Sequence, residues 1–82
     1  MNRLEIGQII KAAGATIIPI EQISIARETG PNMVWWQGSK RVYAIVIMSS
    51  DRTYAMDTHA HEISVEHLID AVPLLEDILR SL

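Results

Sequence analysis

The longest nearly uncharged, β-branched run of the chain, residues 41–48, sets the pattern from which the neighbouring elements are predicted. Its side chains are apolar on both faces of a strand, with Val42 and Val46 on one face and Ile45 and Ile47 on the other. Because alternate residues of a strand point to opposite sides of the sheet, such a run needs cover on both sides. The run is therefore predicted to form a central strand.

The N-terminal pattern is typical of an amphipathic helix. Asn2 is a suitable N-cap, and Glu5, three positions later, completes the spacing of a capping box. Ile6 and Ile9 then lie on one side at helical spacing, and Gly14 is a suitable C-terminal stop. The sequence therefore predicts a helix from Asn2 to about Gly14.

The middle of the chain alternates in the way that strands do, and its turn residues separate one strand from the next. Pro19 cannot donate to a central ladder, so the segment around it is read as an edge segment or an extended loop. The predicted order is an apolar connection at 15–20, a strand from 22, a turn at 29–32, a strand at 33–37, a tight turn at Gly38–Ser39, the strand at 41–48, a turn at 49–52 and a strand at 53–57.

Pairing the strands across these turns divides the apolar residues into two faces. The turns set Trp36 opposite Arg41, as a cross-strand cation–π pair, and Ile47 opposite Tyr54. We expect the helices to cover one face and so to make it the core. The residues of this expected core are Ile25, Val34, Trp36, Tyr43, Ile45, Ile47, Tyr54 and Met56.

The opposite face is too apolar to lie in water comfortably, so we expect it to join two copies of the chain. In the alternative arrangement, residues 15–20 or one of the helices fold across this face. The expected interface residues are Met33, Trp35, Val42, Val46 and Met48.

The C-terminal third is predicted to be helical, with Ser64 as its N-cap and an apolar face that includes Leu68 and Leu75. Pro73 either kinks one helix or opens a second one. The expected fold is a single two-layer α+β domain over residues 1–82, in which an N-terminal helix, an antiparallel β-meander of three to four strands and a C-terminal helix follow one another.

Composition favours association. A chain of 82 residues has a small core, it contains no cysteine for disulfides or thiolate metal ligation, and 49% of its residues are hydrophobic. No run approaches the roughly 20 apolar residues that cross a bilayer, and the N-terminus lacks a signal-peptide pattern, so we expect a cytoplasmic protein. The net charge is −3. An acidic surface on the C-terminal helix is expected to face a basic partner through Glu66, Asp70, Glu76 and Asp77.

A second hypothesis is a metal site. Asp57, His59 and His61 share one face if their strand continues, and two imidazoles with a carboxylate suit zinc or a non-haem ferrous ion. Over these five residues the spacing resembles a metal-binding stretch of the amidohydrolase family. The resemblance implies metal binding but no amidohydrolase activity, since that family needs a barrel several times longer than this chain. In the alternative reading, these residues belong to a surface loop or cap that precedes a helix.

A third hypothesis is a site for single-stranded nucleic acid, because Trp35 and Trp36 lie close in sequence to Lys40 and Arg41. Aromatic rings stack on bases and cations neutralise phosphates. Only seven basic residues are scattered through the chain, which is fewer than a basic stripe requires.

Catalysis is not expected. Ser49, Ser50 and Ser64 are not framed by glycines as in a nucleophile elbow, and phosphate-binding glycine loops do not occur in the sequence. The expected function is a non-catalytic protein–protein interaction or regulatory module of the inhibitor, antitoxin or adaptor type, such as phages or mobile elements encode. It is expected to be a homodimer without a cofactor.

Overall fold

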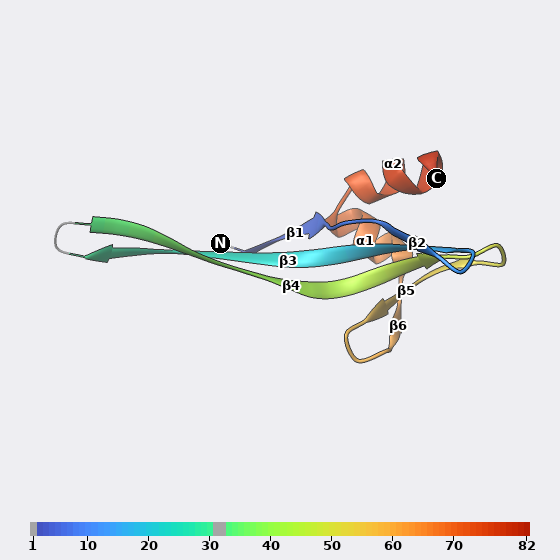
Figure 1. Ribbon diagram of the computed structural model, residues 1–82, viewed down its shortest axis with the longest axis horizontal. Helices are drawn as coiled ribbons and strands as arrows, with labels where there is room; N and C mark the ends of the chain where they lie inside the picture. The colour runs from blue at the N-terminus through green and yellow to red at the C-terminus, as the bar shows by residue number, and fades with distance from the viewer. Residues whose placement is uncertain (1, 31–32) are drawn as a thin grey trace.

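The computed structural model describes residues 2–30 and 33–82, and the side chains of residues 2–25 and 38–82. Six strands form one antiparallel sheet in the order β1-β3-β4-β5-β6, with β2 also paired to β3, and two short helices follow them (Figure 1). The elements are β1 (Asn2–Ile6), β2 (Ile10–Ala12), β3 (Ala15–Gly30), β4 (Met33–Met48), β5 (Thr53–Asp57), β6 (Glu62–Ile63), α1 (Val65–Ala71) and α2 (Leu74–Ser81).

The predicted α+β class and its N-terminal helix are wrong, because the chain is mostly β and its N-terminal residues form β1 and β2. Strand β1 pairs antiparallel with β3, from Asn2 opposite Ser24 to Ile6 opposite Ile20. The side chains of Arg3 and Glu5 form an ion pair of 2.8 Å, as residues two apart on one face of a strand can. The apolar residues of β1 pack against the core at the same two-residue spacing. Hydrogen bonding to β3 therefore outweighs the helix-capping signal.

Pro19 lies in the sheet interior, so the prediction of an edge segment or loop at 15–20 is also wrong. On one side Pro19 is opposite Ile45 of β4. On the other side it faces the break between β1 and β2, where the backbone N–H of Gly7 donates to its carbonyl at 2.8 Å. Gly7 lies just past the end of β1, so the one bond that the missing N–H of proline leaves unmade falls where the β1–β3 ladder ends.

Strands β3 and β4 form one hairpin that is much longer than predicted. Their pairing runs from Thr16 opposite Met48 to Gly30 opposite Met33. Gly38 and Ser39 lie within β4, so the tight turn predicted there is wrong. The predicted pairing of Trp36 with Arg41 fails with it, since both residues belong to one strand.

Strand β1 covers β3 only as far as Ser24, which is opposite Asn2. From residue 25 on, the hairpin continues as two strands alone (Figure 1). We call residues 25–30 and 33–38 the ribbon and the remainder of the described chain the body. The ribbon makes the molecule elongated, with principal extents of 57 × 26 × 25 Å.

The turn at 49–52 and the register that follows it are confirmed. The backbone N–H of Ser49 donates to the Arg52 carbonyl at 3.0 Å, and the Ser49 hydroxyl also donates to that carbonyl. Across this turn Ile47 is opposite Tyr54, and β5 occupies the predicted residues. Local turn chemistry was therefore a sound guide here.

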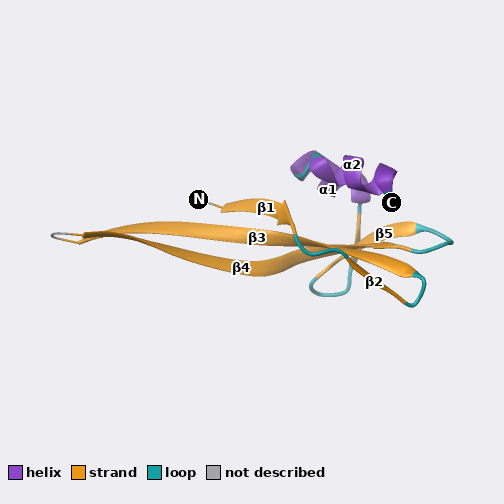
Figure 2. Cartoon of the chain, turned by 45° about the horizontal axis from the view of Figure 1, so that its top comes forward, coloured by secondary structure: helices purple, strands orange, loops and turns teal. Residues whose placement is uncertain are grey.

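The helices cover the sheet face that was expected to form the interface (Figure 2). Val46 of β4 is fully buried, together with Leu68 of α1 and Leu75 of α2. The assignment of the two faces is thus reversed: of the expected core, Tyr43 is 40% exposed, and Ile45, Ile47, Tyr54 and Met56 are only half-buried. Ile25 is half-buried, and the side chains of Val34 and Trp36 lie outside the described residues. The buried core consists of Ile18, Ile20, Ala44, Val46, Ala55, Leu68, Val72 and Leu75.

The helical signals of the last third are confirmed. The Ser64 hydroxyl accepts the backbone N–H of His67 at 3.3 Å, which caps α1. At Pro73 the chain opens a second helix, and does not kink a single one. The break turns α2 so that Leu75 enters the same core as Leu68.

Candidate functional site

The most unusual feature of the sheet is an unpaired edge of β4. Strand β5 pairs with β4 only from Ala44 to Met48, whereas β3 pairs with β4 as far as Met33. Within the described chain, residues 33–43 therefore have a neighbouring strand on one side only. We call these eleven residues the free edge.

A β-bulge lies at the C-terminal end of the free edge, at Tyr43. Ile20 is opposite Ala44, but the next residue, Glu21, is opposite Val42. Tyr43 is thus an extra residue on β4, and a bulge of this kind bends its strand and increases the local twist. Val42 is 47% exposed beside it. The bulge separates the covered part of β4 from its free edge.

The charged residues of the free edge are held toward β3, on the paired side. The ammonium group of Lys40 lies 3.4 Å from the Glu21 carboxylate. The guanidinium group of Arg41 donates to the Gln22 side-chain oxygen from Nε at 3.0 Å and from Nη2 at 2.9 Å. Proteins protect edge strands with charged side chains, prolines, bulges or covering loops. The free edge contains no proline, its bulge lies at its C-terminal end at Tyr43, and its two charged residues, Lys40 and Arg41, are engaged by β3. Its backbone before these residues therefore keeps the properties of a pairing template.

The expected interface residues fall into three groups. Val46 is buried in the chain's own core, and Met48 packs against that core. Val42 is exposed and belongs to the free edge. Met33 and Trp35 occupy backbone positions on the free edge, and their side chains lie outside the described residues. Three of the five residues therefore lie along one edge of the sheet, whereas the sequence predicted that all five lie on one of its faces.

The candidate metal residues form a turn between β5 and β6. Asp57 Oδ1 accepts the backbone N–H groups of His59 at 2.8 Å and of His61 at 3.0 Å. These hydrogen bonds hold the pKa of Asp57 below its ordinary value, and the bond from His61 has the largest effect. Burial of the carboxylate acts in the opposite direction. Ala60 completes the turn with a positive φ of 62°. Asp57 therefore acts as a turn acceptor in this structure.

The side chains of this turn do not converge on one point. The ring centroids of His59 and His61 are 6.3 Å apart, and His61 Nδ1 lies 3.8 Å from Asp57 Oδ2. Among the described residues, no group of three metal-ligating side chains is found. The geometry gives the metal hypothesis no support.

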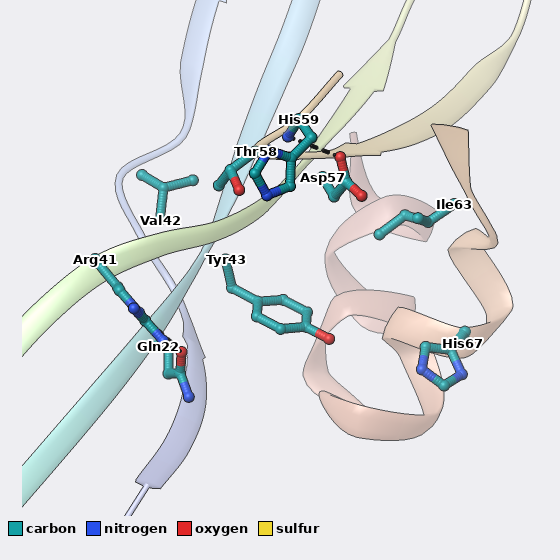
Figure 3. Close-up of a pocket in the computed structure, with 9 residues that line it drawn as sticks. All are labelled: Gln22, Arg41, Val42, Tyr43, Asp57, Thr58, His59, Ile63 and His67. Carbon is teal, nitrogen blue, oxygen red and sulfur yellow. Dashed lines mark hydrogen bonds between the residues drawn. The ribbon is translucent and has the colours of Figure 1, made fainter. Parts of the chain in front are cut away.

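A hollow of about 560 Å³ lies where β5 leaves β4, at the C-terminal end of the free edge. The ring of Tyr43 extends from β4 toward α1, which carries His67, and Asp57 lies across from it (Figure 3). Sequence analysis did not find this hollow, because Tyr43 and His67 are distant in the chain. It is lined by Gln22, Arg41, Val42, Tyr43, Asp57, Thr58, His59, Ile63 and His67.

Two of the four acidic residues that were expected to bind a partner make contacts within the C-terminal helices. Glu76 pairs with Arg80, and the Glu66 carboxylate accepts the Ser64 hydroxyl at 3.1 Å. Asp70 and Asp77 are exposed. Of the four carboxylates, one thus contacts the N-cap of α1, one is in an ion pair, and two face solvent.

The cross-strand cation–π pair of Trp36 with Arg41, which was the alternative to the nucleic-acid hypothesis, is wrong, because both residues belong to β4. A cation–π contact in the described chain joins Arg52 to Tyr54 instead, with the guanidinium carbon 4.4 Å from the ring centroid. Lys40 and Arg41 are engaged with Glu21 and Gln22, as above. Binding of single-stranded nucleic acid by Trp35, Trp36, Lys40 and Arg41 stays a prediction.

Comparison of the chain with protein-family models, with curated proteins and with solved structures finds no match in any of the three. In the described part of the chain, none of the helices has the length and apolar character needed to span a membrane.

Proposed function

We propose that this protein is a non-catalytic interaction module that forms a homodimer by sheet extension along the free edge, residues 33–43. The observation that supports it is the combination of a long unpaired edge with a ribbon of only two strands. An unpaired edge presents a row of backbone donors and acceptors to any strand placed beside it. An isolated two-stranded ribbon is marginally stable in water, whereas a third and fourth strand stabilise it.

A second copy of the chain is the occupant that we propose. Two identical free edges placed antiparallel satisfy each other about a two-fold axis, which is the commonest symmetry of soluble oligomers. The resulting four-stranded ribbon has no free β4 edge left. This proposal keeps the expected homodimer and moves its contact from a sheet face to a sheet edge. The cytoplasm is the compartment in which we expect the dimer, and cell fractionation tests that expectation.

Native mass spectrometry of the intact chain tests the proposal and reports any bound metal in the same spectrum. We expect a metal-free dimer. The informative variant joins Ser24 to Ser39 through Asn-Gly in place of residues 25–38, because Ser24 and Ser39 are directly opposite and Asn-Gly closes a two-residue hairpin. We expect this variant to be a folded monomer with a cooperative unfolding transition.

Two outcomes contradict the proposal. If the intact chain is a monomer at every concentration examined, the free edge does not pair. If the shortened variant forms dimers as strongly as the intact chain, association uses another surface. The identity of any other partner, whether for an inhibitor, an antitoxin or an adaptor role, stays a prediction that a pull-down with the intact dimer tests.

A further inference from the structure

We infer that the two copies pair antiparallel about a two-fold axis at Gly38. In this register, each residue of the free edge lies opposite a residue of the second copy, and the two residue numbers add up to 76. This inference rests on the proposed function, because it specifies how the two edges meet. It makes one register testable against its neighbours.

The limits of the free edge determine this register. Strand β4 begins at Met33, and β5 takes over its outer side at Ala44. In antiparallel pairing about a two-fold axis, the numbers of opposite residues have a constant sum. The register that uses residues 33–43 completely sets Met33 opposite Tyr43 and places Gly38 opposite its own copy.

Gly38 is not explained by the single chain. Its φ is not in the left-handed region, where the structure places Gly14. A Cβ built on Gly38 would meet only the Ser24 carbonyl oxygen, at 3.8 Å, which is ordinary van der Waals contact. A glycine within a strand weakens the strand and often marks a place where another backbone approaches closely. The two-fold axis supplies that close approach.

The residue types on the free edge are complementary in this register. Lys40 is opposite Trp36, and Arg41 is opposite Trp35, so both cations meet an aromatic residue type of the second copy. Val42 is opposite Val34. Opposite residues of antiparallel strands point to the same face of the sheet, so a two-fold axis allows only even sums. The neighbouring even sums, 74 and 78, leave neither cation opposite a tryptophan. The sum of 76 is the register that matches both.

The hollow beside β5 lies at the end of the proposed pairing. The second copy's Met33 is opposite Tyr43, which lines the hollow together with Asp57 and His67. Continuing the second copy's strand past this point would bring it against β5, which is already paired with Ala44. The pairing of β5 with Ala44 thus disfavours registers with a larger sum.

The chain has no cysteine, so single cysteines report this register directly. Directly opposite residues of antiparallel strands have Cα atoms about 4.5–5.5 Å apart, within the range that a disulfide spans. Diagonal neighbours are about 7–8 Å apart, beyond it. We therefore expect Gly38→Cys to form a disulfide-linked dimer at least about tenfold faster than Gln37→Cys or Ser39→Cys. Mixing Gln37→Cys with Ser39→Cys restores cross-linking as a heterodimer.

Spin labels on the same three cysteines give a second measurement that needs no disulfide geometry. The inter-label distance is expected to be shortest at residue 38 and to increase on either side. Faster cross-linking and the shortest distance at another residue would overturn the register while leaving the dimer intact. A monomeric intact chain would contradict the proposed function itself, so the two failures are distinguishable. A dimer whose labels at residues 37–39 are all far apart would overturn pairing along the free edge.

Discussion

The body and the ribbon are built from the same two strands and differ in what stabilises them. In the body, Ile18 of β3 and Val46 of β4 are fully buried beneath Leu68 of α1. In the ribbon, β3 and β4 pair with each other, and no further described strand or helix covers them. Burial of large apolar side chains supplies roughly 1.5–3 kcal/mol each to the body, whereas the ribbon has its ladder and what the proposed second copy would add. One hairpin therefore contains a folded core at one end and the proposed docking element at the other.

The largest expected effect comes from the core of the body. Leu75→Ala removes a side chain that is 0% exposed, and we expect the free energy of unfolding to fall by about 2–5 kcal/mol. Leu74→Ala is the matched control, because Leu74 is the adjacent residue and 59% exposed. Urea unfolding followed by far-UV circular dichroism measures both variants. Equal losses would mean that α2 does not pack against the sheet as described.

A smaller effect, a gain in the free energy of unfolding, is expected at the turn between β2 and β3. Ala13 and Gly14 both have positive φ, of 52° and 78°, as a two-residue type I′ hairpin requires. Alanine is strained by about 1–2 kcal/mol in that region, whereas asparagine tolerates it. We expect Ala13→Asn to raise the free energy of unfolding by about 1 kcal/mol.

Lys11→Asn is the control for the new side chain, since Lys11 lies in the adjacent strand. It is expected to give no gain. An unchanged midpoint for Ala13→Asn in urea would show that the turn differs from the one described.

The pH dependence of the body is expected to include a contribution from Asp57. Hydrogen bonds from the backbone of His61 and His59 lower the pKa of Asp57 in the folded state. A group whose pKa is lower in the folded state than in the unfolded state stabilises the protein at every pH above its unfolded-state pKa. That stabilisation is lost as the pH falls through the folded-state pKa. We therefore expect Asp57→Asn to lose stability at neutral pH and to match the wild-type protein below the folded-state pKa of Asp57.

Urea midpoints of the two proteins across the acid range measure this convergence. Asp51→Asn is the control, because Asp51 is an exposed carboxylate in the turn before β5. A difference between wild type and Asp57→Asn that stays constant down to low pH would contradict the role of the ionised carboxylate.

The smallest effects are expected from ion pairs whose cation is exposed, in the body and beside the ribbon alike. Arg80→Ala removes the pair with Glu76 in α2, and Lys40→Ala removes the pair with Glu21 between β4 and β3. Exposed pairs contribute about 0–1 kcal/mol, so both variants should unfold within about 1 kcal/mol of wild type. If Lys40→Ala changes the dimer–monomer equilibrium and Arg80→Ala does not, the free edge contributes to the contact between the two copies and α2 does not.

Several elements were determined by the sequence alone, because their signals are local. The strand at 53–57, its register across the Ser49–Arg52 turn, the cap at Ser64 and an interruption of the helix at Pro73, which the sequence left open as a kink or a break, are all present in the structure. Each depends on residues within one turn or on the dihedral limits of a single proline. Such signals act wherever the rest of the chain lies.

The tertiary structure decided the elements that depend on distant partners. Residues 2–12 fit a helical spacing and a strand spacing, and β3 provides the backbone partners that favour the strands. Gly38 and Ser39 resemble a turn, and the unbroken pairing with β3 extends them. Both faces of β4 are apolar, so the sequence did not say which one the helices would cover. The free edge follows from where β5 ends along β4, and no local pattern of residues encodes the length of a neighbouring strand.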